Sequence, residues 1–310
     1  MKNGLYKVLF DVFIILSILF TLDVFIGWAG EKYIHWLNRK PRNSEAALVN
    51  YSLNAAAPDV AIIGSSTAIC HYVPTVLHDS LCNMGYDYKV FNMGIANQRL
   101  TYDYYGLRCL LKRTIPKIVI VDVWASFLGE GNPTTAFEAF KPYIKVNEDI
   151  KEMLKTHDQL DILSKSNLYC FNTHFVKLLL AVFRPSGSDG FHTSNAELDV
   201  VKKGISKDKS RLSSLSVKEF NEMLSLAKSK NIKLFVIMSP TLRSSDTTSL
   251  SYQYIKNKCT NEKIPFLDYS NDERYQKSCF FRDTTHLNYS GAYFFSSCLM
   301  RDLKKYLNKE

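Results

Sequence analysis

The most continuous apolar stretch of the chain lies near its beginning. Residues 8–28 contain two charged side chains, Asp11 and Asp23, one near each end of the stretch. As a helix, a stretch of this length crosses a hydrocarbon core of about 30 Å, and a carboxylate near the interface is far less costly than one at mid-bilayer. Trp28 ends the stretch and Trp36 follows it, an arrangement that is typical of a membrane–water interface. The pattern predicts a transmembrane helix.

Two other readings of this stretch exist. A cleaved signal peptide has a shorter apolar stretch that ends in a small-x-small site, which Gly27-Trp28-Ala29 matches poorly. A buried helix of a soluble domain rarely stands at the very start of a chain. We therefore expect an uncleaved single-pass anchor over residues 1–30 and a polar, irregular juxtamembrane linker over 31–57. Lysine and arginine residues lie on both sides of the span, so the positive-inside rule leaves its orientation open.

Strands and helices alternate from residue 58 onward. Short apolar runs of the kind found in buried parallel strands occupy 60–63, 89–91, 117–123, 233–238 and 265–268. Helical spacing of apolar residues occurs over 100–113 and 289–307, and a capping box at Ser216–Glu219 predicts a helix start at Ser216. The alternation predicts one three-layer α/β/α domain over 58–310 with a mostly parallel five-stranded sheet. An insert over 127–215 interrupts it.

The amino-acid composition argues against several classes of protein. Of 310 residues, 46% are hydrophobic and 22% are charged, which is typical of a globular protein and argues against a mainly disordered or multi-span membrane protein. The formal net charge of +9 is spread along the chain, without the basic stripe or known module that nucleic-acid binding requires. Seven cysteines without metal-like spacing predict neither a disulfide framework nor a metal site.

The first candidate for chemistry is Gly64-Ser65-Ser66-Thr67, directly after the first predicted strand. This position is the carboxyl edge of a parallel sheet, where α/β proteins place their sites. A serine there also begins the next helix, close to backbone N–H groups and the positive end of the helix dipole, a setting that favours a nucleophile. The alternative is that these residues simply cap the helix.

The second candidate is Asp283-Thr284-Thr285-His286, before the last predicted helix. A carboxylate three residues before a histidine can orient the imidazole through one nitrogen and leave the other free to accept a hydroxyl proton. The alternative is an uncoupled surface pair. A zinc site needs three or four ligands, and the sequence offers no recognisable set here.

The two motifs together resemble the SGNH/GDSL hydrolase superfamily, in which a serine follows the first strand and Asp-x-x-His precedes the last helix. The resemblance implies a flavodoxin-like sheet, with Ser66 as nucleophile, His286 as general base and Asp283 as its orienting partner. It covers the sheet scaffold, roughly residues 58–126 and 216–305, and not the insert.

The family has four sequence blocks, of which the serine motif is the first and Asp-x-x-His the last. The second and third blocks of this chain depart from the family pattern. Asn92–Gln98 is similar to the second block, which implies oxyanion donors at Gly94 and at Asn97, where the family has glycine. Trp124-Ala125-Ser126-Phe127 stands where the third block has an asparagine, so Ser126 is the nearest polar substitute. Ser65, beside the nucleophile, completes the candidate oxyanion and substrate-binding residues.

The altered blocks and the anchor together look like membrane-anchored relatives of this superfamily, such as the D-alanyl transfer and alginate O-acetylation proteins. That similarity implies an extracytoplasmic domain, acylated cell-envelope glycans as substrate and a membrane-bound O-acyltransferase as partner. We therefore expect a cofactor-independent serine ester hydrolase or acyl (acetyl) transferase. A non-catalytic, membrane-anchored glycan-binding or scaffold protein is the alternative.

Overall fold

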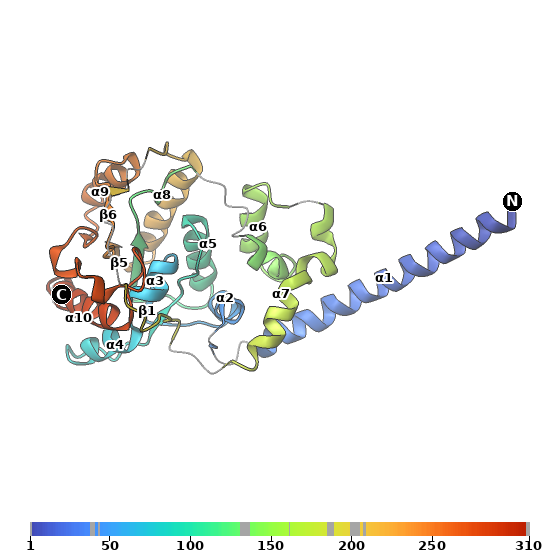
Figure 1. Ribbon diagram of the computed structural model, residues 1–310, viewed down its shortest axis with the longest axis horizontal. Coiled ribbons are helices and arrows are strands. Elements are labelled where there is room, and N and C mark those ends of the chain that lie inside the picture. Colours follow the sequence, from blue (N-terminus) through green and yellow to red (C-terminus); the bar gives the residue numbers. More distant parts are fainter. Residues whose placement is uncertain are drawn as a thin grey trace.

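The structure is a computed structural model that describes residues 2–37, 41–42, 44–130, 137–160, 162–184, 189–198, 205–206 and 209–307. One long helix, α1 (Lys2–Leu37), projects from a folded α/β domain (Figure 1). The remaining α-helices run in chain order as α2 (Glu45–Asn54), α3 (Ser66–His71), α4 (Pro74–Cys82), α5 (Leu100–Leu111), α6 (Glu148–Thr156), α7 (Asn167–Ala181), α8 (Ser214–Ser229), α9 (Leu250–Asn261) and α10 (Tyr289–Leu307).

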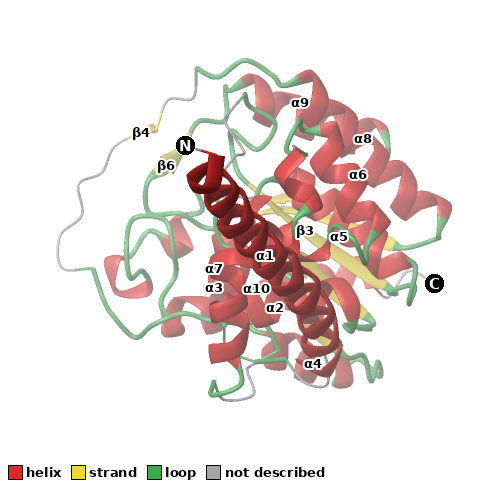
Figure 2. Cartoon of the chain, turned by 90° about the vertical axis from the view of Figure 1, so that its right-hand side faces the viewer, coloured by secondary structure: helices red, strands yellow, loops and turns green. Residues whose placement is uncertain are grey.

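A five-stranded parallel sheet forms the centre of the domain (Figure 2). Its spatial order is β2-β1-β3-β5-β7, which confirms the predicted fold class. The strands are β1 (Val60–Ile63), β2 (Val90–Asn92), β3 (Ile118–Val123), β5 (Lys233–Met238) and β7 (Phe266–Asp268). A separate two-stranded sheet pairs β4 (Ile205–Ser206) with β6 (Ser244–Ser245). The 3₁₀ segments are η1 (Phe137–Tyr143), η2 (Ile162–Lys165), η3 (Glu273–Tyr275) and η4 (Ser278–Phe280).

Helices cover both faces of the sheet, which explains why its main strands are continuously apolar. Successive strand side chains point to opposite faces. In β1, Ala61 and Ile63 join the hydrophobic cluster that includes α2, α5, α8 and α9. Val60 and Ile62 join the cluster that includes α4 and α10. Both cores therefore rest on the same strands and hold the two helical layers in place.

Most predicted elements are present, but one predicted helix start is wrong. The last helix has the predicted bounds, Tyr289–Leu307. Helix α8 begins at Ser214 rather than Ser216, because the Ser213 hydroxyl accepts a hydrogen bond from the Ser216 N–H at 3.2 Å. The Ser213 N–H in turn donates to the Leu128 carbonyl, which fixes the earlier cap.

The segment predicted as an irregular linker, 31–57, contains ordered helix. Helix α1 continues to Leu37, which is buried with Ile34. Helix α2 then forms behind an N-cap at Ser44 and buries Leu48, Val49 and Leu53 in the core. The linker prediction was wrong because α2 is short and its few apolar residues are mixed with polar ones. Its helical structure therefore depends on tertiary packing rather than on a clear sequence pattern.

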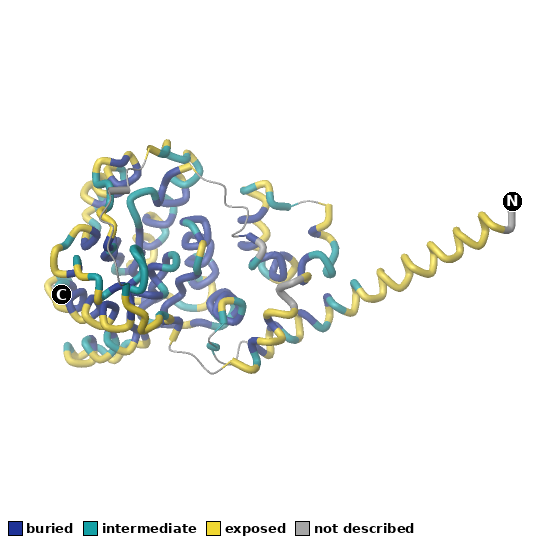
Figure 3. The backbone as a smooth tube through the Cα atoms, in the orientation of Figure 1, coloured by how far each residue is buried: buried dark blue, intermediate teal, exposed yellow. Residues whose placement is uncertain are grey.

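Helix α1 has two parts with different surroundings. The residues near its N-terminus are exposed, and the helix is long and apolar enough to cross a membrane (Figure 3). From Asp23 onward it contacts the insert: the Asp23 carboxylate accepts hydrogen bonds from the Ser166 hydroxyl at 2.6 Å and the Leu168 N–H at 2.9 Å. An aspartate expected at the membrane interface therefore also caps helix α7.

Two glycines let α7 approach α1 closely. A Cβ atom at Gly27 would lie 2.5 Å from the Asn167 side chain, and one at Gly30 would lie 2.3 Å from the Phe171 ring. Further along, the Tyr33 hydroxyl donates to the Leu178 carbonyl at 2.9 Å. The insert is thus packed on the C-terminal half of the long apolar helix α1.

We predict that Gly30→Leu separates α7 from α1, because the added side chain occupies the space of the Phe171 ring. Overpacking of this kind costs about 1–3 kcal/mol, and thermal unfolding of the detergent-solubilised full chain should show a lower midpoint, by about 2–4 °C per kcal/mol. Gly4→Leu is the matched control, because nothing lies within 4 Å of its Cβ position. Equal midpoints for Gly30→Leu and the wild type would contradict this packing.

Candidate active site

Ser66 is the first residue of α3, immediately after the turn that leaves β1. The turn contains Gly64, whose φ of +148° is a conformation that L side chains rarely adopt. A Cβ at Gly64 would also lie 3.0 Å from Ala68 and from Asp122. Gly64 therefore allows a sharp exit from the sheet, which leaves the Ser66 side chain half-buried at the carboxyl edge.

The Asp283–His286 segment forms a tight loop before α10. An isolated bridge pairs Phe281 with Leu287 and closes the loop. Within it, one oxygen of the Asp283 carboxylate accepts the N–H groups of Thr285 and His286, each at 2.8 Å. These two bonds fix the carboxylate relative to the backbone that carries the imidazole.

The structure brings Ser66, His286 and Asp283 together in one hydrogen-bonded chain. The Ser66 Oγ lies 2.8 Å from His286 Nε2, and His286 Nδ1 lies 2.8 Å from Asp283 Oδ2. The side chain of His286 is 21% exposed and that of Asp283 is 48% exposed. With Asp283 accepting from Nδ1–H, Nε2 is the unprotonated nitrogen and can accept the serine proton.

The surroundings keep Asp283 ionised. Burial alone raises the pKa of this carboxyl, but the hydrogen bonds from Thr285 N–H, His286 N–H and the imidazole outweigh it, so the pKa is lowered. The Arg282 Nε, at 3.7 Å from Asp283 Oδ2, adds a positive charge on the same side. An ionised acid at this position stabilises a positively charged imidazole beside it.

The predicted oxyanion residue Gly94 is already engaged. Its N–H donates to the Asn92 side-chain oxygen at 3.0 Å, while the Asn92 amide group donates to the Ala68 carbonyl at 2.7 Å. Asn92 thereby binds the second block to α3, and the Gly94 N–H points to Asn92 rather than to a substrate. No sequence pattern predicts that the Asn92 side chain, two residues earlier, accepts this hydrogen bond.

Asn97, Ser126 and Ser65 have different positions. Asn97 is exposed and adopts a φ of 59°, a conformation that asparagine tolerates. Its segment is bound beside the nucleophile turn, because the Ile95 N–H donates to the Gly64 carbonyl at 3.1 Å. Ser126 lies half-buried in the turn after β3, and Ser65 caps α3 through its backbone. Among the described residues, neither serine hydroxyl forms a hydrogen bond with the triad.

Two further residues, His71 and Asp122, belong to a buried network below the triad. His71 Nε2 accepts the Leu287 N–H at 3.0 Å, and its Nδ1 lies 2.9 Å from the Ser239 hydroxyl. Burial, and next the nearby His286, hold the pKa of His71 well below its usual value, so it is neutral. His71 thus fixes the backbone immediately after His286.

Asp122, at the end of β3, fixes the position of α3 in the same way that His71 fixes the backbone after His286. Its fully buried carboxyl accepts hydrogen bonds from the hydroxyls of Thr67 and Tyr72. Burial raises the pKa of Asp122 to about 6, although the hydrogen bonds from Thr67, Tyr72 and Ser239 act in the opposite direction. The carboxyl binds the helix that begins with Ser66 to the central strand of the sheet.

Comparison with known proteins gives similarity in structure but not in sequence. No protein-family model and no curated protein sequence matches the chain. Similar solved structures include the esterase EstA from a Pseudoalteromonas species (10% identity, TM-score 0.43, 81% of this chain and 98% of that chain). Others are the acetyl xylan esterase AlAXEase (14%, 0.41, 79% and 99%) and a lipase/acylhydrolase from Enterococcus faecalis (12%, 0.40, 80% and 96%).

We predict a pH-dependent contribution of Asp122 to stability. A carboxyl whose pKa rises on folding stabilises the fold fully below its unfolded value, 3.8, and this stabilisation is lost as the pH rises through about 6. Asp122→Asn removes the titration. The unfolding free energy of the wild type, relative to this variant, should therefore fall by on the order of 1–3 kcal/mol between pH 4 and 7.

Chemical denaturation at several pH values measures this difference. Asp79→Asn, which removes an exposed carboxyl on α4, is the matched control for the loss of one aspartate. A constant difference between the wild type and Asp122→Asn across this range would show that Asp122 does not titrate as its burial requires.

Proposed function

We propose that this protein is a serine-dependent ester hydrolase or acyl transferase. The observation that carries the proposal is the continuous hydrogen-bonded chain from Ser66 Oγ through His286 to Asp283. The Ser66 hydroxyl lies 2.8 Å from the imidazole, and the carboxylate orients the imidazole from its other side. This arrangement is typical of nucleophilic acyl transfer.

The proposed reaction has two halves. Ser66 Oγ attacks the ester carbonyl carbon while His286 Nε2 takes the hydroxyl proton, and Asp283 stabilises the resulting imidazolium. His286 then returns the proton to the departing alcohol oxygen, which leaves the acyl group on Ser66. A water or sugar hydroxyl, deprotonated by His286, attacks the acyl-serine, and the proton on His286 returns to Ser66 Oγ as the ester bond breaks.

The oxyanion of each tetrahedral intermediate needs hydrogen-bond donors. The backbone N–H of Ser66, at the start of α3, is placed beside the attacking oxygen. Asn97 is the second proposed donor, because within the described part of the chain its N–H makes no hydrogen bond and its segment is bound beside Gly64. The occupied Gly94 N–H and the missing third-block asparagine leave this set weaker than the family pattern. A missing donor costs about 10²–10³ in rate.

The apolar helix and the altered third block motivate acyl transfer as the finer form of the proposal. A missing oxyanion donor slows attack by water and by a sugar hydroxyl alike, so the acceptor is decided by which of them the site binds beside the acyl-serine. The long apolar helix α1 supports a membrane anchor, which would hold the domain close to a bilayer and suits an extracytoplasmic enzyme that acts on cell-envelope glycans. A membrane-bound O-acyltransferase is the partner that such an enzyme would need as an acyl source.

Replacing the nucleophile gives the first test. We expect Ser66→Ala in the solubilised full chain to lose p-nitrophenyl acetate hydrolysis by about 10³-fold or more. Ser297→Ala, which removes an exposed hydroxyl on α10, should keep it. A polysaccharide acceptor in the same assay, with acetate measured in both products, separates release to water from transfer to sugar.

The possible results lead to different conclusions. Activity that survives in Ser66→Ala would exclude Ser66 as the nucleophile. A wild-type protein inert in both assays would favour the alternative, a non-catalytic glycan-binding or scaffold protein. Acetylation of the polymer with little free acetate would identify a transferase.

A further inference from the structure

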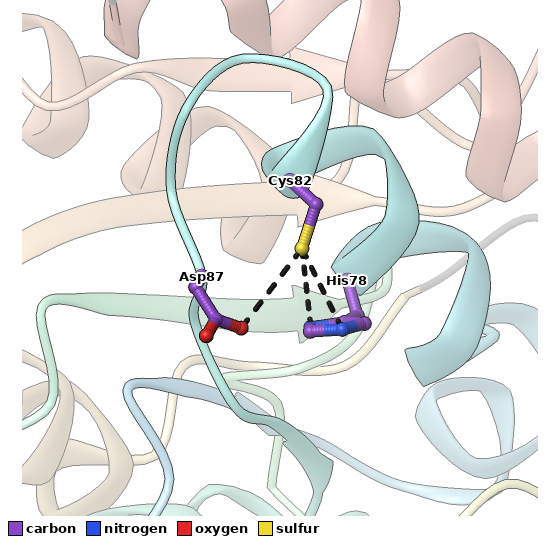
Figure 4. Close-up of side chains that lie close together, drawn as sticks. All are labelled: His78, Cys82 and Asp87. Carbon is purple, nitrogen blue, oxygen red and sulfur yellow. Dashed lines mark hydrogen bonds between the residues drawn. The ribbon is translucent and has the colours of Figure 1, made fainter.

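Three metal-binding side chains meet on the outside of the domain, apart from the triad. His78 and Cys82 are one helical turn apart on α4, so they share one face of the helix. Asp87 follows a tight turn in which the Gly85 N–H donates to the Cys82 carbonyl and the Tyr86 N–H to the Leu81 carbonyl. The turn directs the chain back along α4, and the three side chains point toward one another (Figure 4).

The spacing of the three ligand atoms is close to that of a tetrahedral metal site. Cys82 Sγ lies 3.6 Å from His78 Nε2 and 4.0 Å from Asp87 Oδ1, and all the ligand atoms are within 4.8 Å of one another. With Zn–S near 2.3 Å and Zn–N near 2.0–2.1 Å, neighbouring ligands of tetrahedral zinc are about 3.6 Å apart. Ligand atoms up to 4.8 Å apart must approach by about 1 Å, and the imidazole must turn so that its Nε2 lone pair faces the ion.

The imidazole of His78 is held in the tautomer that leaves Nε2 free to bind a metal. Its Nδ1 lies 2.8 Å from the Tyr88 carbonyl oxygen, so Nδ1 carries the proton and donates it there. The lone pair is then on Nε2, the nitrogen nearer to Cys82 Sγ. Metal-binding histidines commonly donate their second ring N–H to a carbonyl or carboxylate, which fixes the tautomer and the ring.

The charge and softness of the ligands select the class of metal. A neutral imidazole, a thiolate and a carboxylate together carry two negative charges, which a divalent ion neutralises. Sulfur and nitrogen ligands suit zinc and similar transition metals, whereas magnesium and calcium prefer all-oxygen sites. Cys82 and Asp87 are exposed and His78 is half-buried, so an ion can reach the site from solvent.

We propose that His78, Cys82 and Asp87 form a Zn²⁺ site with a water as the fourth ligand. The ion would join the C-terminal end of α4 to the segment that leads into β2. Ser66 lies on the preceding helix, α3, and α4 begins at Pro74, so the site is at the far end of α4 from the triad. Its role is therefore structural and independent of the proposed acyl chemistry.

Cobalt substitution tests the site directly. Co²⁺ added to the tag-free, detergent-solubilised full chain should bind at one equivalent and give the near-ultraviolet charge-transfer band of a thiolate ligand. We expect Cys82→Ser to lose the band and to bind Zn²⁺ more than about tenfold more weakly. Cys279→Ser is the matched control, because Cys279 is the other exposed cysteine among the described residues and should leave the band unchanged.

Thermal unfolding gives a second readout that does not depend on spectroscopy. Because a ligand that binds the folded state stabilises it, Zn²⁺ should raise the unfolding midpoint of the wild type and of Cys279→Ser, but not of Cys82→Ser. His78→Gln should behave like Cys82→Ser. A wild type without a thiolate band or a Zn²⁺-dependent midpoint, or a band that persists in Cys82→Ser, would overturn the proposal.

Discussion

The site depends on one long-range hydrogen bond, from Ser66 Oγ to His286 Nε2, between residues 220 positions apart. Parallel strands make this contact possible, because the carboxyl ends of β1 and β7 open onto the same edge of the sheet. Helix α10 then returns across the face occupied by α3 and α4. Ser296 on α10 accepts the Val73 N–H and donates to the His71 carbonyl, which joins the two halves just below the triad.

The buried groups around this bond form one network, in which Ser239 lies beside both His71 and Asp122. Asp122 binds α3 to the central strand, and His71 fixes the backbone that follows His286. Neither group touches the reacting atoms, so their contribution is positional. Packing also joins the insert to the long N-terminal helix, where Asp23, Gly27 and Gly30 of α1 contact α7.

Part of this arrangement was predictable from local patterns. The apolar runs identified the strands, and the serine after the first strand together with Asp283 and His286 identified the residues that meet. The rest depends on tertiary contacts between distant residues. The Asn92 side chain that occupies the Gly94 N–H and the helix within 31–57 leave no periodic signal. The caps at Asp23 and Ser213 likewise depend on partners far away in the chain.

The most direct test of the coupled serine and imidazole is covalent labelling. Mass spectrometry of the full chain after treatment with a fluorophosphonate should find one phosphonyl group, on Ser66. Replacement of His286 by alanine should prevent the labelling, because the hydroxyl then has no base beside it. Absence of the adduct in the wild type, or equal labelling without His286, would contradict the account.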